Sequence, residues 1–151
     1  MITKLQNARI YDPINRINGK IKDLYIKNGH IIDKPKHGEK VSTTINLKNK
    51  IIMAGGIDIH SHIAGGKVNL ARLLLPEEHR KYLYSSSEKL RSGSGLGTCS
   101  SFHIGYKYAK LGYSAVFEPA VLPSNARSAI IEMSDIPFID KGTYTVLSND
   151  D

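Results

Sequence analysis

Two histidines, His60 and His62, close an apolar run that also carries Asp58. The run predicts a short strand, in which alternate side chains point to the same face. The spacing therefore predicts that the two imidazoles project together. Imidazole is a good zinc ligand, so two convergent rings would supply half of a four-coordinate shell. Asp58 would share their face, either orienting a metal ligand or making an ordinary strand-end hydrogen bond.

The position of this pair in the chain strengthens a signal that is weak on spacing alone. In parallel α/β folds the reactive groups collect at the carboxyl ends of strands. The pair follows a Gly55-Gly56 turn and ends the first strand of its region, and Glu118 ends the second. The Glu118 carboxylate could approach a metal or substrate, or cap the next turn. No residue is assigned a catalytic role.

The elements expected after Met53 alternate between strand and helix. Two further strands are expected over Ser114–Phe117 and Thr143–Leu147. Helices are expected over Val68–Leu75, from Pro76, over Phe102–Leu111 on a face of Phe102, Tyr106 and Ala109, and over Asn125–Met133 with Ser124 as its cap, with a loop over Ser85–Cys99. This alternation predicts parallel βαβ units.

The first third of the chain has a different pattern, of short strands only. They are expected over Lys4–Tyr11, Asp23–Lys27, His30–Asp33 and Thr43–Met53. Asn28-Gly29 predicts a two-residue hairpin turn, because a type I′ turn needs positive φ at both positions. We expect a small antiparallel sheet. Residues 1–53 hold eleven Lys or Arg and four Asp or Glu, so they carry the whole excess of the +7 net charge.

Composition narrows the function classes. The chain has 151 residues and one cysteine, which excludes an internal disulfide framework and suits a reducing cytoplasm. No apolar run approaches the ~20 residues of a membrane span. The lysines are scattered and no nucleic-acid-binding motif accompanies them, so we expect neither membrane nor nucleic acid as a partner.

Several longer segments carry a family resemblance. They are residues 55–69, 72–74, 76–79, 105–109, 112–113, 118–120, 126–127 and 135–140. These segments resemble the A-type subunit of formylmethanofuran dehydrogenase, a family of the amidohydrolase superfamily. The resemblance implies a β-sandwich followed by a zinc-dependent (β/α)8 barrel. Residues 1–53 would be the β-sandwich part, and residues 54–151 the first three βα units of an incomplete barrel.

The same resemblance implies an activity in methanogenesis from CO2. The family interconverts formate plus methanofuran with N-formylmethanofuran at a dinuclear zinc centre. Partner subunits carry a molybdenum or tungsten pterin and iron–sulfur clusters. His60 and His62 are the metal ligands that carry over. The others, a carboxylated lysine, two histidines and an aspartate, lie on later strands of the family barrel.

Length shapes what we expect of this chain by itself. A (β/α)8 barrel needs about 200–250 residues, so three strands would leave a sheet edge open. We expect a truncated or split homologue that is inactive alone and assembles with the other subunits or with a complementing chain. The alternatives are a non-catalytic assembly module of the complex and a fragment of another cyclic-amide amidohydrolase.

Overall fold

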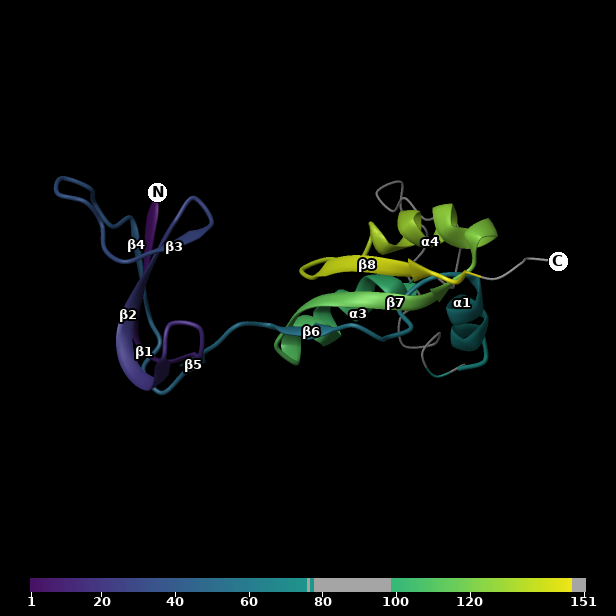
Figure 1. The fold of residues 1–151 in the computed structure, drawn as a ribbon, viewed down its shortest axis with the longest axis horizontal. Coiled ribbons are helices and arrows are strands. Elements are labelled where there is room, and N and C mark those ends of the chain that lie inside the picture. Colours follow the sequence, from purple (N-terminus) through teal and green to yellow (C-terminus); the bar gives the residue numbers. More distant parts are fainter. Residues whose placement is uncertain (76, 78–98, 148–151) are drawn as a thin grey trace. The chain divides into compact units, whose positions relative to one another are not determined.

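The structure is a computed structural model that describes residues 1–75, 77 and 99–147 (Figure 1). It is a mixed α/β chain in two compact units, Met1–Ala54 and Gly55–Asp151. None of the helices in the described ranges has the length and apolarity that a membrane span requires.

The first unit is a five-stranded sheet of order β3-β2-β1-β4, with β5 also paired to β1. Its strands are β1 (Ile2–Asp12), β2 (Ile17–Lys27), β3 (His30–Ile32), β4 (Thr43–Asn46) and β5 (Ile51–Ile52). The predicted antiparallel sheet is wrong for its second half, because β4 and β5 run parallel to β1. A tight turn must reverse the chain, whereas the longer connection over residues 33–42 lets β4 return to the far edge of β1 in the same direction.

The β2–β3 hairpin has the predicted turn. Asn28 and Gly29 have φ values of 50° and 78°, as a type I′ turn requires. The flanking strands pair antiparallel, with Lys27 opposite His30. Local turn chemistry therefore sets this part of the sheet.

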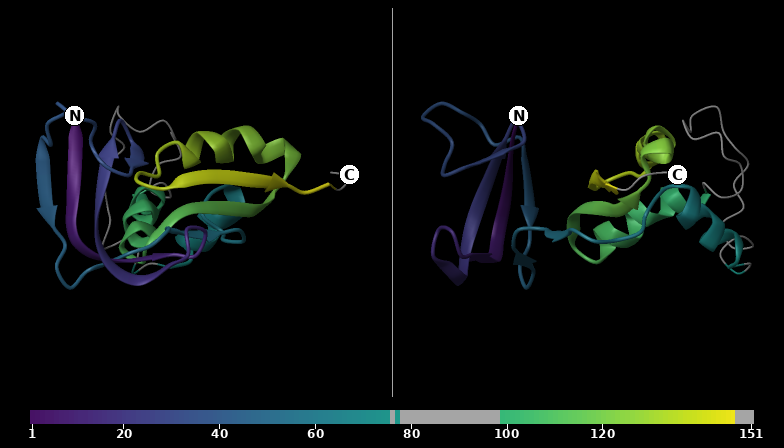
Figure 2. Two further views of the ribbon diagram at one scale, coloured as in Figure 1. Left: turned by 60° about the vertical axis from the view of Figure 1, so that its left-hand side comes forward. Right: turned by 45° about the vertical axis from the view of Figure 1, so that its right-hand side comes forward.

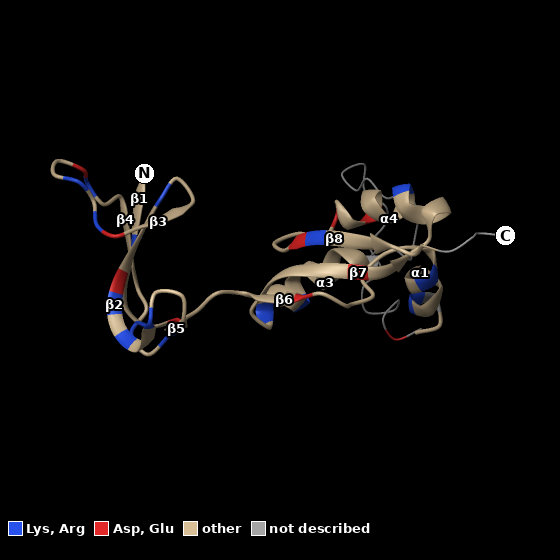
Figure 3. Cartoon of the chain, viewed as in Figure 1, with Lys and Arg blue, Asp and Glu red and all other residues tan. Residues whose placement is uncertain are grey.

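The basic residues of this unit do not form a single cluster. Figure 3 shows Lys and Arg along β2 and in the connecting loops. Two of the lysines are paired with carboxylates, Lys4 with Asp23 and Lys27 with Glu39. The excess charge therefore lies on a dispersed, solvated surface.

Asp23 stabilises an irregularity in β1. Its carboxylate accepts a hydrogen bond from the backbone N–H of Asn7 at 3.0 Å, where the pairing of β1 with β2 shifts register and φ is positive at 62°. It also pairs with the Lys4 ammonium at 2.8 Å. The hydrogen bond from Lys4, followed by that from Asn7, lowers the pKa of Asp23 below its usual value.

Replacing Asp23 with asparagine should therefore change how stability depends on pH. A carboxyl group whose pKa is lowered by folding stabilises the protein above its unfolded-state pKa, and this contribution is lost as pH falls through the folded-state pKa. We expect Asp23→Asn to unfold at lower urea than the wild type at neutral pH, with the difference shrinking towards pH ~3. Hydrogen exchange at the Asn7 amide would locate the effect. Asp33→Asn removes an exposed carboxylate and is the control; an equal loss there would contradict the assignment.

The second unit contains a three-stranded parallel sheet in sequence order, β6-β7-β8 (Figures 1 and 2). Its elements are β6 (Gly56–Asp58), α1 (Gly66–Leu73), α3 (Cys99–Lys110), β7 (Tyr113–Val121), the 3-10 turn η2 (Pro123–Asn125), α4 (Ala126–Met133) and β8 (Asp140–Thr145). The predicted parallel βαβ arrangement is confirmed. The predicted loop over Ser85–Cys99 and the helix expected from Pro76 lie mostly outside the described residues.

One predicted cap is wrong. Ser124 was expected to cap the last helix, but it lies inside η2, and Asn125 occupies the N-cap of α4 without a side-chain hydrogen bond. Pro123 explains the shift, since its fixed φ favours the first position of a helical turn.

The helices α3 and α4 share one core with β7. Val116 of β7 packs with Ile63, with Met133 of α4 and with the segment after it; Ile104 and Tyr108 of α3 pack against this cluster. A Cβ at Gly105 would lie 2.1 Å from the carbonyl oxygen of Pro137, so this glycine permits α3 to approach the segment after α4. This core fixes the end of β7 beside the chain that follows β6.

Candidate functional site

The two histidines lie just beyond β6, not within it. β6 ends at Asp58, so the expectation that His60 and His62 alternate along a strand is wrong. The ladder with β7 is broken by a register shift and stops at Asp58, which leaves residues 59–65 outside the sheet. The rings nevertheless lie close together, with centroids 5.9 Å apart and planes at 77°. Both side chains are accessible.

The carboxylate of Glu118, which is 1% exposed, lies at the centre of this loop. It accepts four hydrogen bonds. The donors are Nδ1 of His62 at 2.8 Å and the backbone N–H groups of Ile63 at 2.6 Å, Ala64 at 3.3 Å and Ala120 at 3.3 Å. Glu118 therefore joins the end of β7 to the histidine loop.

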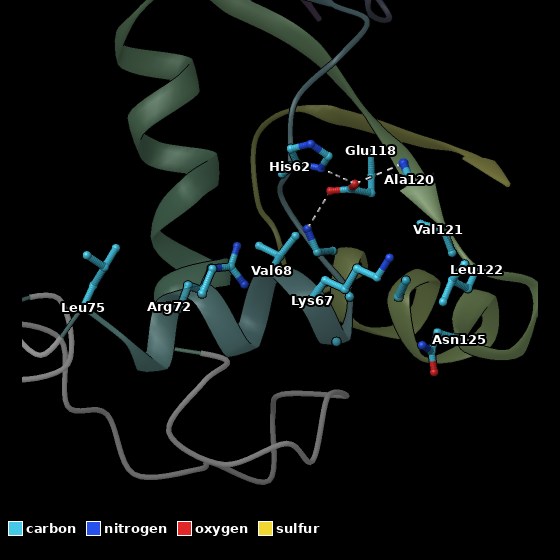
Figure 4. A pocket seen from close by; sticks show the side chains of 15 residues that line it. His62, Lys67, Val68, Arg72, Leu75, Glu118, Ala120, Val121, Leu122 and Asn125 are labelled. Atoms are coloured by element: carbon cyan, nitrogen blue, oxygen red, sulfur yellow. Dashed lines mark hydrogen bonds and ion pairs between the residues drawn. The ribbon is translucent and has the colours of Figure 1, made fainter. Parts of the chain in front are cut away.

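This contact defines how His62 can act. A carboxylate only accepts hydrogen bonds, so Nδ1 of His62 must carry the proton of the contact. In a neutral imidazole the lone pair then lies on Nε2. Figure 4 shows His62 directed at Glu118 from the chain after β6. The geometry leaves Nε2 as the nitrogen able to ligate a metal.

A second contact set fixes the backbone at His60. Oδ1 of Asp58 accepts the His60 backbone N–H at 3.1 Å, and the Tyr108 hydroxyl donates to Oδ2 at 3.2 Å. The same hydroxyl is hydrogen-bonded to Ser61. Burial raises the pKa of Tyr108, which keeps its hydroxyl protonated and able to donate. Asp58 therefore acts on His60 through the backbone rather than through the ring.

Tyr108 was not among the expected site residues. The predicted face of its helix consisted of Phe102, Tyr106 and Ala109, whereas Ile104 and Tyr108 contact the core. The signal that could have identified them is their i, i+4 spacing, which places both on one face.

A buried ion pair fixes the next residues of the loop. Glu132 of α4 and Arg72 of α1 are bonded at 2.8 Å, with side chains 4% and 9% exposed. The other Glu132 oxygen accepts the backbone N–H of Gly65 at 2.9 Å and Nδ2 of Asn69 at 2.8 Å. Ser101 of α3 hydrogen-bonds to both charged groups. Four separate segments thus meet at one buried polar cluster.

Arg72 also donates to the carbonyl oxygen of Ile63. Successive loop residues are therefore bonded to different anchors, since Ile63 and Ala64 bond to Glu118 and Gly65 bonds to Glu132. The sequence had not indicated Arg72 or Glu132, because charged residues on short amphipathic helices are usually solvated.

A cavity of about 450 Å³ adjoins this loop. His62 and Glu118 line one side of it, and α1, α4 and the chain after β7 line the rest (Figure 4). Within the described residues, no group of three or more His, Cys, Asp and Glu side chains could hold a metal ion. The two imidazoles are therefore half of a possible metal shell.

The parallel sheet with a His-x-His pair beyond its first strand is typical of metal-dependent hydrolases. A family model described as the amidohydrolase family matches residues 43–150, and the chain belongs to this family. Its relatives identify the branch. It is 37% identical over 145 residues to Protein FwdA of Methanocaldococcus jannaschii. It is 35% identical over 151 residues to the FhcA component of the formyltransferase/hydrolase complex Fhc of Methylorubrum extorquens. The predicted resemblance is confirmed.

The chain is also similar to a solved structure. This is the formyltransferase/hydrolase complex FhcABCD of M. extorquens in complex with methylofuran, with a TM-score of 0.75, 35% identity and 100% of this chain covered. The alignments cover 96% and 100% of this chain but 25% and 26% of the two relatives. The chain therefore spans about a quarter of the length of the relatives it matches.

Proposed function

We propose that this chain supplies the His60–His62 half of a zinc-dependent site that hydrolyses, or forms in reverse, an N-formyl amide of a furan-type one-carbon carrier. The observation that supports it most is the fixed orientation of His62, whose Nδ1 is bonded to the buried Glu118 beside a second imidazole. Carboxylate-bound histidines of this kind are common in metal sites.

The residues present fit zinc as part of its shell. Nε2 of His62 and the ring of His60 would bind it, and Glu118 and Asp58 would orient the loop that carries them. When bound, zinc lowers the pKa of a water ligand towards ~7 and polarises a carbonyl. A catalytic zinc normally has three protein ligands, so we expect two histidines alone to bind it weakly. The remaining ligands would come from a further segment or a second chain.

The fold supports this reading of the site. Three parallel strands in sequence order, with helices between them, correspond to the first βα units of a (β/α)8 barrel. We propose that residues 54–151 form these units and residues 1–53 the small β part. In such barrels the chemistry lies beyond the carboxyl ends of the strands, where the His pair and Glu118 are found.

The relatives suggest the substrate and partners. One is a component of a formyltransferase/hydrolase complex, whose solved structure contains methylofuran. We propose methanofuran or a similar carrier as the amine, and the other subunits of a formylmethanofuran dehydrogenase or related complex as partners; pterin-bound molybdenum or tungsten and iron–sulfur clusters would belong to those partners. Hydrolysis breaks the formyl C–N bond, forms a C–O bond from water and passes a proton to the amine.

Metal removal tests this proposal on the protein purified with any subunits that accompany it. We expect zinc to co-purify, chelation to abolish hydrolysis of the N-formyl carrier, and added zinc to restore it. His60→Ala/His62→Ala should lose zinc and hydrolysis together. His37→Ala removes an exposed histidine of the first unit and is the control.

One outcome would contradict the proposal. If the double variant kept the zinc content and the activity of His37→Ala, the two imidazoles would not be ligands. If it also assembled normally with its partners, the chain would instead serve as a non-catalytic assembly module.

A further inference from the structure

We infer that the cavity beside His62 binds an organic acid, with an apolar body in the cavity and a carboxylate at Lys67. This extends the proposed function, on which it rests for the reacting end of the ligand. The substrate class would be N-formyl amides of amines that also carry a carboxylate.

The walls of the cavity are apolar. Val68 and Ala71 lie three residues apart on α1, and Leu75 follows four residues later, so the three line one side. Val121 and Leu122, beyond the last turns of β7, line the opposite side (Figure 4). A volume of about 450 Å³ lies within the range of small-molecule sites. An aliphatic or aromatic group would bury apolar surface here.

The charged side chains that line the cavity differ in what they can offer a ligand. The Glu118 carboxylate is used by the histidine loop, and Arg72 is paired with Glu132. Lys67 is exposed, and Figure 4 shows it reaching from α1 towards the end of β7. Within residues 1–75, 77 and 99–147 its ammonium makes no hydrogen bond or ion pair. Lys67 is therefore the cation of this cavity that can receive an anion.

The remaining polar group orients the ligand. His62 lines the same cavity as Lys67, and its Nδ1 is occupied by Glu118. A formyl group directed to the imidazole pair and a carboxylate at Lys67 would place the apolar body between the two walls. A neutral ligand of the same shape would lose the charge-assisted hydrogen bond.

Binding of a matched pair of probes tests this inference. N-formyl-L-leucine and its neutral carboxamide would be titrated calorimetrically into the protein as purified with its partners, after chelation of metal. We expect the acid to bind about tenfold more tightly than the amide, equivalent to about 1.4 kcal/mol. Lys67→Met should remove this difference, and Lys67→Arg should keep most of it.

Two further variants separate the charge from the cavity. Lys110→Met removes an exposed lysine at the end of α3, away from the cavity, and should leave the preference for the acid unchanged. Ala71→Phe should fill the cavity from an exposed helix position and weaken both probes. Equal binding of acid and amide, or a preference that survives Lys67→Met, would overturn the inference.

The result is independent of the metal proposal. Since the probes are titrated without metal, loss of the Lys67 effect would refute only the acid site. Absence of zinc dependence in the His60→Ala/His62→Ala comparison would refute only the hydrolytic site.

Discussion

Replacing Glu118 with leucine is expected to lower the free energy of unfolding by about 3 kcal/mol or more, because buried donors left without an acceptor cost ~1–3 kcal/mol each. The backbone N–H groups of Ile63 and Ala64 would lose their acceptor inside the core of the second unit. Denaturant unfolding of the purified protein would measure this loss.

The milder Glu118→Gln variant addresses orientation rather than folding. Its side chain has nearly the same shape but a single acceptor oxygen, so it cannot serve His62 and the backbone donors together. We expect zinc affinity to fall about 10–100-fold, the effect typical of removing the group that orients a histidine ligand. Glu77→Gln, an exposed carboxylate, is the control. Wild-type zinc affinity in Glu118→Gln would show that His62 is not oriented for a metal by this contact.

Arg72→Met should be as damaging as the loss of Glu118, for a different reason. Breaking a buried ion pair by removing one partner costs about 3–5 kcal/mol, since it leaves the other charge buried. Here Glu132 would remain buried at 4% exposure without its cation. The free energy of unfolding from urea titration would measure the loss, and Arg127→Met, on the exposed side of α4, is the control.

A double variant distinguishes the pair from the rest of its network. Arg72→Met/Glu132→Leu removes both charges, so the cost of the stranded carboxylate disappears. The loss should still be appreciable, because Gly65 and Asn69 also lose their acceptor. Additive effects of the two single substitutions would show that the pair is not coupled.

The features that could be predicted from sequence depend on local chemistry. The Asn28-Gly29 turn requires only the φ preferences of its own residues. The order and parallel direction of β6, β7 and β8 follow from the alternation of strand and helix patterns. The parallel pairing of β4 with β1 was missed, because it depends on the path of a long connection.

The site divides in the same way. His60, His62 and Glu118 could be identified from their places at strand ends, although the strand stops earlier than expected. Arg72 and Glu132 could not, because their burial results from how α1, α3 and α4 pack together. A charged residue on a helix has no local signature that separates a buried partner from a solvated one.

The anchoring of the histidine loop has a consequence for the order in which the chain folds. The backbone N–H groups of Ile63 and Gly65 are bonded to side chains 55 and 67 residues further along. Long-range contacts of this kind form only after the entropy of closing the intervening chain has been overcome. During synthesis the two imidazoles emerge well before either glutamate. They acquire their native arrangement only once α4 has docked, so a correctly shaped metal site reports that the whole second unit has folded.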